Sequence, residues 1–257
     1  MAKIIAFTIF KGGTGKTTSA VNTAAALVEL GKRVLLVDLD QQASSTRYLG
    51  IDPDQVNPTL YHVFRQQTPA RVVIQHTPFN VDVLPSSSLM AAIEESLEPG
   101  DEILLRNILE PLQDTYDYIL IDTPPGKAGL AFNGIVAADL LIIPASAERM
   151  AIDGVSDLMN HLQAIIWHKY RDELNNQDIR ILFTMFRHGN KHSPGIVQAT
   201  RKIYKGNVLD IVIPETVEFP RSYDRKTPIT VLAPRHQGSK SYRDVAKWII
   251  QYADTTT

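Results

Sequence analysis

The chain has 257 residues, of which 44% are hydrophobic and none is cysteine. This length and composition predict a globular protein with a sizeable core, and the missing cysteines exclude disulfides, thiol catalysis and cysteine-ligated zinc or iron–sulfur clusters. The formal net charge of -2 is uneven, because residues 1–180 carry 14 basic and 22 acidic side chains whereas residues 181–257 carry 12 and 6.

Apolar runs alternate with helical patterns along the whole chain. Strands are expected at residues 3–10, 33–40, 81–87, 116–123, 139–145, 179–186 and 208–214. Helices are expected at residues 17–31, 60–66, 89–112, 194–206 and 241–254, the third of them broken near residues 98–102 by a Pro-Gly pair. This alternation predicts an α/β fold with a mostly parallel twisted sheet and helices on both faces.

The chain shows no internal repeat or linker, so residues 1–257 are expected to form a single domain, with residues 254–257 as a frayed tail. No apolar stretch reaches the roughly 20 residues that span a bilayer. The N-terminus MAKIIAFTIF has no basic leader followed by a cleavage site. We therefore expect a soluble, cytoplasmic protein.

The first expected strand leads into FKGGTGKTT, residues 10–18, which is close to the phosphate-binding pattern G-x-x-x-x-G-K-[ST]. Phe10 stands where the first glycine belongs, and Lys11 follows it. Glycines let the loop aim backbone N–H groups at phosphate oxygens before a helix begins. Lys16 would place a charge at the outer phosphates, and the Thr17 hydroxyl suits Mg²⁺. The predicted nucleotide-binding residues are Lys11, Gly12, Gly13, Thr14, Gly15, Lys16, Thr17 and Thr18.

Aspartates end two further apolar strands, at the edge of the sheet where α/β proteins bind ligands. ILIDTPPG ends its strand in Asp122, which looks like a Walker B aspartate that holds Mg²⁺ through water. LLVDLDQ offers Asp38 and Asp40, which lie on the same side if the strand continues through both. Each aspartate alone is open to a simpler interpretation as the cap of a turn. Three of them around one phosphate loop favour a metal and nucleotide site.

These motifs, together with AERMAIDGV at residues 147–155 and IPETVEFPRSYDRKTPI at residues 213–229, resemble the ParA/MinD family of deviant-Walker ATPases over nearly the whole chain. The likeness is to the short Soj-like ParA type, because no helix-turn-helix region precedes the first strand. It implies a P-loop NTPase that binds ATP and Mg²⁺ as a homodimer with ATP sandwiched between the subunits. Lys11 would be the signature lysine that reaches the phosphates of the other subunit.

The resemblance also implies residue roles. Lys11, Lys16 and Asp40 are the expected catalytic residues, since cations placed against a transferring phosphoryl group promote the reaction and Asp40 would orient the attacking water. Thr17, Asp38 and Asp122 are the expected metal residues. At the dimer interface, Glu148 and Asp153 would receive the partner's Lys11. Gln41 stands where relatives usually have proline, which we expect to loosen the loop after Asp40.

Residues 213–229 align with the segment that folds around the adenine in relatives. The resemblance therefore implies that Pro214, Glu215 and Thr216 read the base, with Arg187 and Asn190 on a neighbouring loop. Soj-like relatives also bind DNA without sequence preference, through basic residues that would here be Lys191, Arg201, Lys202, Lys205, Arg221, Arg225, Lys226, Arg235, Lys240 and Arg243. Glu215 or Glu218 stands where relatives often have a DNA-contacting arginine. A ParB-like adaptor on a plasmid, chromosome or protein compartment would stimulate hydrolysis, and the protein would associate with the nucleoid.

Three alternatives remain open from the sequence. A MinD-like membrane ATPase would need a cationic amphipathic C-terminal helix, but residues 241–254 carry only Arg243 and Lys247 as cations. A small-molecule P-loop kinase or synthetase is possible because the fold and phosphate loop do not determine the acceptor. Finally, the basic residues of the C-terminal part could be ordinary solvated side chains.

Overall fold

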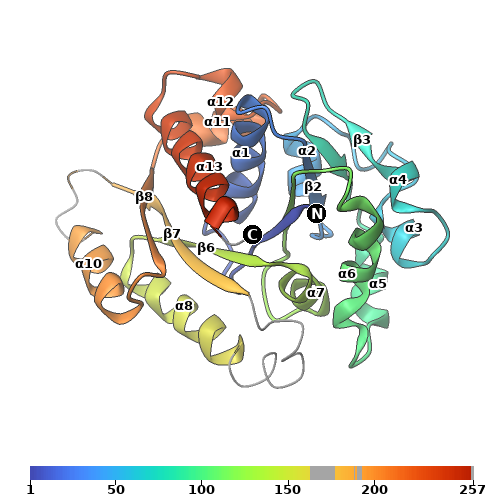
Figure 1. Cartoon of the computed structure of the whole chain (residues 1–257), viewed down its shortest axis with the longest axis horizontal. Coiled ribbons are helices and arrows are strands. Elements are labelled where there is room, and N and C mark those ends of the chain that lie inside the picture. The colour runs from blue at the N-terminus through green and yellow to red at the C-terminus, as the bar shows by residue number, and fades with distance from the viewer. Residues whose placement is uncertain (163–176, 188, 190–192, 256–257) are drawn as a thin grey trace.

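One eight-stranded sheet runs through the protein in the order β3-β4-β2-β5-β1-β6-β7-β8 (Figure 1). The computed structural model describes residues 1–162, 177–187, 189 and 193–255. All neighbouring strands pair in parallel except β3, which runs antiparallel to β4 at one edge. The strands are β1 (Lys3–Phe7), β2 (Val34–Asp38), β3 (Gln75–His76), β4 (Asp82–Leu84), β5 (Tyr118–Asp122), β6 (Leu140–Ser146), β7 (Asp178–Phe186) and β8 (Val208–Pro214).

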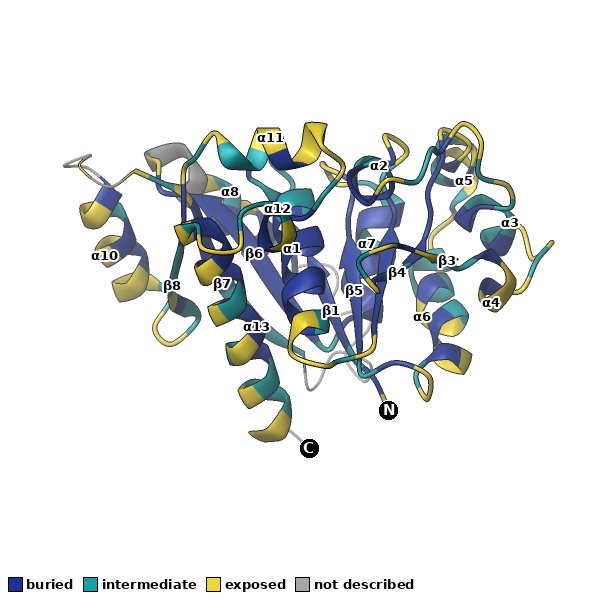
Figure 2. Cartoon of the chain, turned by 90° about the horizontal axis from the view of Figure 1, so that it is seen from above, coloured by how far each residue is buried: buried dark blue, intermediate teal, exposed yellow. Residues whose placement is uncertain are grey.

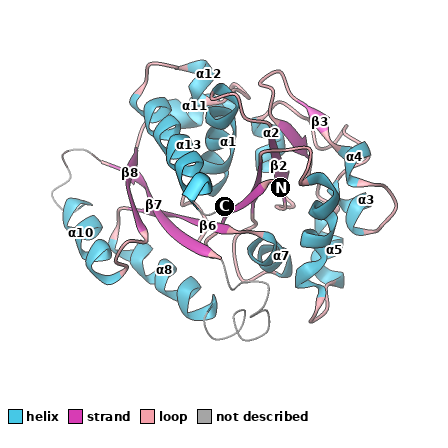
Figure 3. Ribbon diagram, viewed as in Figure 1, coloured by secondary structure: helices cyan, strands magenta, loops and turns pink. Residues whose placement is uncertain are grey.

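Helices cover both faces of the sheet, which confirms the expected α/β architecture (Figures 1 and 3). On one face lie α1 (Lys16–Glu29), α2 (Ser44–Tyr48), α11 (Glu218–Asp224), α12 (Ile229–Leu232) and α13 (Gln237–Thr255). On the other lie α3 (Leu60–Phe64), α4 (Ala70–Val73), α5 (Met90–Ser96), α6 (Leu104–Leu109), α7 (Gly129–Ala137), α8 (Arg149–His161) and α10 (Ser193–Ile203), with the short 3-10 turns η1 (Asp101–Ile103) and η2 (Glu110–Leu112).

The sheet separates two hydrophobic cores. Ile4 and Ala6 of β1 pack in one core, whereas Ile5 and Phe7 pack in the other. Successive side chains of a strand point to opposite faces, so a strand covered on both faces needs apolar residues at every position. The central strands are accordingly buried along their length (Figure 2). The uninterrupted apolar runs of the sequence are the direct consequence of this arrangement.

Three strands end two or more residues earlier than expected at the edge where the ligand site lies, and one of them is β4, which ends at Leu84 and not at residue 87. β1 ends at Phe7 and not at residue 10, and β2 ends at Asp38 and not at residue 40. In both places the chain leaves the sheet to form a turn. The strand therefore does not continue through Asp38 and Asp40, which was the condition for placing both side chains on the same side. The two-residue strand β3 was not expected, because its sequence QH carries no apolar alternation.

Helices α1, α3, α5, α6, α10 and α13 lie where helices were expected, whereas α2, α4, α7, α8, α11 and α12 were not expected. Helix α5 ends at Ser96, and Gly100 has a φ of 119°, so the Pro-Gly pair splits the segment as expected. Helix α13 runs to Thr255, two residues into the segment expected to be frayed, while residues 256 and 257 lie outside the described part. Within the described residues, no helix combines the length and apolar character needed to cross a membrane.

Gly134 of α7 lets that helix approach the sheet closely. A Cβ atom at this position would lie 2.7 Å from Cγ2 of Thr123 and 3.1 Å from Cδ1 of Leu39. Thr123 cannot rotate away freely, because its buried hydroxyl donates a hydrogen bond to the carbonyl oxygen of Phe7 at 2.9 Å. The absence of a side chain at Gly134 is therefore a packing requirement.

Gly134→Ala is expected to lower the free energy of unfolding by about 1–3 kcal/mol, the usual cost of overpacking a core. Urea denaturation followed by circular dichroism measures this loss. The matched control is Gly195→Ala in α10, where a Cβ would meet no atom within 4 Å. That change is expected to raise the free energy of unfolding by about 0.5–1 kcal/mol, as for other exposed helical glycines. Equal effects of the two substitutions would contradict the packing argument.

Candidate functional site

The phosphate loop connects β1 to α1 and is fixed from two sides. Gly13 and Gly15 have φ values of 72° and 85°, a conformation that glycine adopts at little cost. The Thr184 hydroxyl at the end of β7 donates a hydrogen bond to the carbonyl oxygen of Thr14 at 2.8 Å. On the other side, the N–H of Gly126 donates to the carbonyl oxygen of Phe10 at 2.8 Å. The expected strand, glycine loop and helix are therefore present, and the loop is held in place by neighbouring strand ends.

Lys16 lies inside this loop and is only 8% exposed. Its Nζ donates to the carbonyl oxygens of Ile9 at 3.2 Å and Lys11 at 3.4 Å. Burial lowers the pKa of Lys16, and the carboxylates of Asp122 and Asp40 oppose that shift. The site thus holds a cation at the N-terminus of α1, where backbone N–H groups also favour an anion.

Asp122 and Asp38 are register partners on β5 and β2 and are both fully enclosed. The Ser45 hydroxyl donates to Oδ2 of Asp122 at 2.6 Å. Oδ1 of Asp122 is buried without a hydrogen-bond partner among the described residues. Burial raises the pKa of Asp122, and the hydroxyls of Ser45 and Thr17 and the Lys16 ammonium oppose the shift. An unpaired buried carboxylate oxygen beside Thr17 fits a hydrated Mg²⁺ ion.

Asp38 uses both of its oxygens within the protein. The N–H and hydroxyl of Thr46 donate to Oδ2 at 2.9 and 2.7 Å, and the N–H of Asp40 donates to Oδ1 at 3.2 Å. Burial raises the pKa of Asp38, and the facing carboxylate of Asp122 raises it further. This arrangement favours Asp122 over Asp38 as the carboxylate of a metal site and makes Asp38 an anchor for the chain that follows β2.

The described residues contain no group of three or more His, Cys, Asp or Glu side chains placed to hold a metal ion. Mg²⁺ commonly takes one or two carboxylates together with substrate phosphates and water. Thr17 and Asp122 fit that mode of binding.

Asp40 begins a tight turn, which we call the Asp40 turn (residues 40–43). The N–H of Ala43 donates to the Asp40 carbonyl oxygen at 2.8 Å, and the N–H of Gln42 donates to Asp40 Oδ1 at 2.9 Å. Ser86 Oγ also donates to the Asp40 carbonyl oxygen, at 2.7 Å. Gln41 is exposed in this turn. Despite the missing proline, three hydrogen bonds hold the turn.

The sequence reasoning missed Ser45, Thr46 and Ser86, although all three are fully buried and contact the aspartates or the Asp40 turn. Serine and threonine are common in turns and helix starts, so their presence carries no spacing signal of its own. The only hint was that hydroxyl-rich stretches follow the second and fourth strands, SSTRY at residues 44–48 and SSS at residues 86–88.

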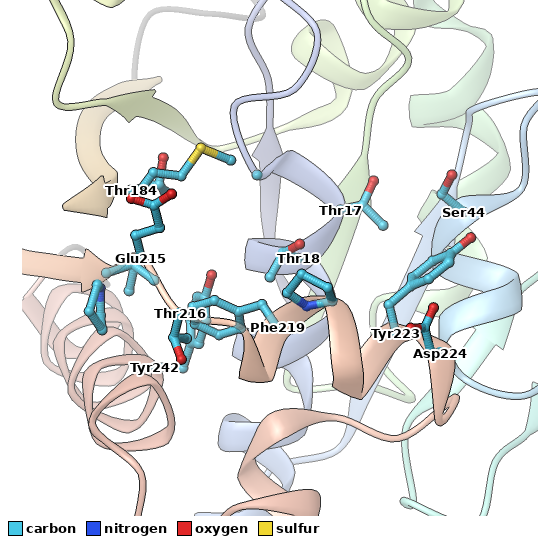
Figure 4. Close-up of a pocket in the computed structure, with 15 residues that line it drawn as sticks. Thr17, Thr18, Ser44, Thr184, Glu215, Thr216, Phe219, Tyr223, Asp224 and Tyr242 are labelled. Carbon is cyan, nitrogen blue, oxygen red and sulfur yellow. The ribbon is translucent and has the colours of Figure 1, made fainter. Parts of the chain in front are cut away.

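A cavity of about 490 Å³ opens beside the N-terminus of α1 (Figure 4). Thr17 and Thr18 of α1 lie on one side, while Phe219 and Tyr223 of α11 lie on another (Figure 4). The cavity is large enough for a nucleoside, which matches the usual volume of ligand sites. Its lining residues are Gly15, Thr17, Thr18, Ser44, Thr184, Met185, Ile213, Pro214, Glu215, Thr216, Phe219, Pro220, Tyr223, Asp224 and Tyr242.

The residues predicted to read the base divide into two groups. Pro214, Glu215 and Thr216 line the cavity. Arg187 is not among the lining residues and pairs instead with Glu215, its Nη2 lying 2.8 Å from Oε1. This hydrogen bond from Arg187 holds the pKa of Glu215 below its usual value. Asn190 lies outside the described residues. Phe219 and Tyr223 of α11 belong to the segment that was aligned with the adenine-binding stretch of relatives, but these two aromatic side chains were not singled out.

Lys11 differs from Lys16 in its surroundings. Its side chain is half-buried and makes no hydrogen bond or ion pair with any residue that the structure describes. Glu148, just before α8, and Asp153 within α8 are both exposed. Gly154 lies beside Lys11, because a Cβ there would be 3.7 Å from Cβ of Lys11. The structure therefore brings Lys11 next to the helix of Asp153 and provides Lys11 with no ionic partner among these described residues.

The candidate DNA-binding residues lie on both faces of the sheet. Arg201 and Lys202 belong to α10 and Lys205 follows it, on the sheet face opposite α11 and α13 (Figure 1). Arg201 pairs with Asp210 at 3.0 Å, and Arg221 of α11 pairs with Glu218 at 3.4 Å. Exposed cations without an ion pair to a described residue are Lys202, Lys205, Arg225, Lys226, Arg235 and Lys240. Lys191 lies outside the described residues.

Arg243, another of the DNA candidates, makes internal contacts. Its Nε lies 2.6 Å from Glu29 Oε2 of α1, and its guanidinium also donates to the carbonyl oxygens of Pro234 and Thr230. The side chain thus ties α13 to α1. Tyr242, Val245, Ala246 and Ile249 of the same helix are buried in the core on that face of the sheet. The apolar face that a membrane helix would need is therefore used for internal packing.

Comparison with known proteins places this site in a family. Residues 2–180 match the family model described as AAA domain. The chain is 35% identical over 250 residues to the sporulation initiation inhibitor protein Soj of Bacillus subtilis (strain 168), covering 96% of this chain and 98% of that protein. It is 32% identical over 255 residues to the chromosome-partitioning ATPase Soj of Treponema pallidum (strain Nichols), covering 97% of this chain and 98% of that protein.

Solved structures share the fold over the full length. Cobyrinic acid a,c-diamide synthase from Mycobacterium smegmatis, with bound ADP and magnesium, superposes with a TM-score of 0.86 at 26% identity, covering 100% of this chain and 97% of that one. The septum site-determining protein MinD from Pyrococcus horikoshii OT3, complexed with Mg-ADP, superposes with a TM-score of 0.81 at 25% identity, covering 100% of this chain and 99% of that one. With Soj relatives matched over nearly their whole length and the phosphate loop built as the motif requires, the chain belongs to the ParA/MinD family of P-loop ATPases.

Proposed function

We propose that this protein is a ParA-type ATPase that binds ATP and Mg²⁺, dimerises with the nucleotide between its subunits, and uses the cycle to position or segregate a cargo. The observation that carries the proposal is the contrast between two lysines of one loop. Lys16 is enclosed near Asp122 and Asp40, whereas Lys11 has no ionic partner among the described residues. A lysine that has no ionic partner among the described residues of its own subunit is suited to reach phosphates bound by another.

The enclosed carboxylates and lysine support a hydrolytic role. In ATP hydrolysis, a water oxygen bonds to the γ-phosphorus while the bond from that phosphorus to the β,γ-bridging oxygen breaks; ADP is the leaving group, and the proton lost by the water is released to solvent. Asp40 is proposed to orient this water, and Lys16 and the partner's Lys11 to stabilise charge on the phosphoryl oxygens. Thr17 and Asp122 are proposed to hold Mg²⁺, which neutralises phosphate charge when bound. The cavity beside α1 is proposed to receive the base.

The oligomeric state in the presence of nucleotide tests the dimer. The chain has a mass of 28.6 kDa, so size exclusion with light scattering separates the monomer from a species of twice that mass. We expect the dimer with a non-hydrolysable ATP analogue and Mg²⁺, and the monomer with ADP. A mass that does not change with nucleotide would contradict the proposal.

DNA binding is proposed to involve the face formed by α11, α12 and α13. Four exposed cations lie there without an ion pair to a described residue: Arg225, Lys226, Arg235 and Lys240. Exposed lysine and arginine side chains bind the phosphates of DNA, and these contacts do not depend on the base sequence. Dimerisation would double the number of cations that face the DNA, which would link DNA binding to the nucleotide state.

Changing these four residues to alanine is expected to weaken ATP-dependent binding to plasmid DNA. The logarithmic salt dependence of binding should become shallower by about 0.9 for each phosphate that the protein no longer neutralises. Co-sedimentation with DNA over a series of salt concentrations measures both effects. The control is Lys202→Ala with Lys205→Ala, on the opposite face of the sheet. If only the control pair weakened binding, the DNA surface would belong to α10.

Two other functions are tested alongside. Retention on anionic liposomes with no retention on DNA would favour the MinD-like membrane alternative, which the internal packing of α13 disfavours. The likeness to a structure described as cobyrinic acid a,c-diamide synthase keeps a small-molecule synthetase as the second candidate. DNA-stimulated release of phosphate without any organic acceptor would favour the partition ATPase. The cargo adaptor would be a protein that stimulates this release further.

A further inference from the structure

Ser86 joins two parts of the site that are far apart in the sequence. It follows β4 and is fully buried. Its Oγ donates to the carbonyl oxygen of Asp40 at 2.7 Å, and its N–H donates to Oγ1 of Thr46 at 3.1 Å. One residue therefore holds the start of the Asp40 turn and also the helix that follows the turn.

The hydrogen bonds of Ser86 complete a closed frame around Asp40. Thr46 donates its hydroxyl to Asp38 at 2.7 Å, and Asp38 in turn accepts the N–H of Asp40 at 3.2 Å. The backbone of Asp40 is thus fixed on its amide side by Asp38 and on its carbonyl side by Ser86. Oδ1 of Asp40 accepts a hydrogen bond from the N–H of Gln42. The direction of the Asp40 carboxylate therefore depends on the path of the backbone through the Asp40 turn.

Because Gln41 stands where relatives usually have proline, the hydrogen bonds around Asp40 matter more for holding the Asp40 turn in this chain. Proline at the second position of a turn restricts the backbone before folding, and Gln41 lacks that restriction. The N–H of Gln41 makes no hydrogen bond to a described residue, and its side chain is exposed. Apart from the hydrogen bonds within the turn itself, the constraint on the Asp40 carbonyl comes from Ser86.

We propose that Ser86 is a positioning residue for hydrolysis, which acts by fixing the carbonyl of Asp40 and through it the direction of the Asp40 carboxylate. The inference rests on the proposed role of Asp40 in the reaction. Ser86 does not line the cavity, and its hydrogen bonds go to Asp40 and Thr46, outside the phosphate loop, so it should affect turnover more than nucleotide affinity.

Ser86→Ala is expected to lower kcat about tenfold, since a small misplacement of a catalytic group costs one to two orders of magnitude. Nucleotide affinity should change less than about twofold, because the groups that bind phosphate stay in place. The matched control is Ser87→Ala, the neighbouring buried serine, whose hydroxyl lies 3.2 Å from that of Thr59 and makes no hydrogen bond to the described residues of the Asp40 turn. This control should leave kcat unchanged.

A second readout needs no nucleotide. Amide hydrogen exchange at Gln42 and Ala43, whose N–H groups bond to Asp40, should be faster in Ser86→Ala and unchanged in Ser87→Ala. Ser86→Cys should give the same pattern without leaving a cavity, because a thiol fills the space but is a weak donor. Adding Gln41→Pro to Ser86→Ala should slow exchange at Ala43 and recover part of kcat, since proline restricts the turn by another means.

These experiments distinguish a failure of the positioning role of Ser86 from a failure of the proposed role of Asp40. If Asp40→Ala hydrolyses ATP at the parent rate, the proposed role of Asp40 is wrong. If Asp40→Ala is inactive but Ser86→Ala and Ser86→Cys match Ser87→Ala in both kcat and amide exchange, the positioning role of Ser86 is wrong and the proposed function stands. An equal loss of kcat in Ser86→Ala and Ser87→Ala would assign the effect to general stability and would also overturn the inference.

Discussion

Lys11→Ala is expected to abolish ATP-dependent dimerisation while the monomer still binds nucleotide. Lys16 keeps its place within the loop in this variant, so the phosphates retain the cation of their own subunit. Lys11 makes no ion pair with a described residue, and its removal should change the free energy of unfolding by no more than about 0.5 kcal/mol. The effect should therefore fall on the association of subunits and not on folding.

The size of the effect follows from the symmetry of the dimer. Each subunit would contribute one lysine to the phosphates of the other, and a hydrogen bond to a charged group is worth about 1.5–3 kcal/mol. The two bonds together amount to about 3–6 kcal/mol, or a factor of about 10²–10⁴ in the dimerisation constant. Light scattering with a non-hydrolysable ATP analogue measures dimerisation, and titration calorimetry measures binding to the monomer.

Two lysine controls make this result specific. Lys32→Ala removes a lysine near the start of β2, at the opposite end of the strands, and should dimerise normally. Lys16→Ala should lose nucleotide binding itself, because its ammonium lies inside the loop. A normal ATP-dependent dimer from Lys11→Ala would show that the nucleotide does not bridge subunits through this lysine.

The sheet and its helices could be predicted from the sequence because buried parallel strands require apolar residues on both faces. Ile4 to Phe7 are such a run, and they divide alternately between the two cores. The strand ends could not be predicted in the same way. Asp38 is as buried as the apolar residues before it, and only its hydrogen bonds to Thr46 and Asp40 show that the strand has ended.

The phosphate loop and its aspartates could be predicted because their chemistry depends on residue type and short spacing. Lys16, Thr17 and Asp122 meet where the motif places them. Ser45, Thr46 and Ser86 could not be predicted, since their hydrogen bonds join segments about 40 to 80 residues apart. The distribution of the basic residues over the two faces could not be predicted for a related reason. Arg201 and Arg225 are close in sequence, but the chain crosses the sheet edge between them and places them on opposite faces.

Asp40→Ala is expected to accumulate as an ATP-bound dimer that hydrolyses ATP about 10²–10⁴-fold more slowly, the usual contribution of a positioned acid or base. The substitution leaves the hydrogen bonds of the Asp40 carbonyl to Ser86 and Ala43 available, so the turn should keep its course. Lys11, Lys16 and the cavity are untouched, so binding and dimerisation should persist. Phosphate release in a single turnover measures hydrolysis, and light scattering measures the trapped dimer.

Asp54→Ala is the control for Asp40→Ala, because Asp54 has a side chain 73% exposed and its one ion pair to a described residue is with Arg47 at 3.4 Å. It should hydrolyse ATP at the parent rate. Asp40→Asn then separates two roles of the carboxylate, since an amide oxygen can still accept the N–H of Gln42 but carries no charge. If Asp40→Asn retained most of the activity, Asp40 would act by orienting the water through geometry. If Asp40→Asn were as slow as Asp40→Ala, the negative charge itself would be required, and parent-rate hydrolysis by Asp40→Ala would exclude both roles.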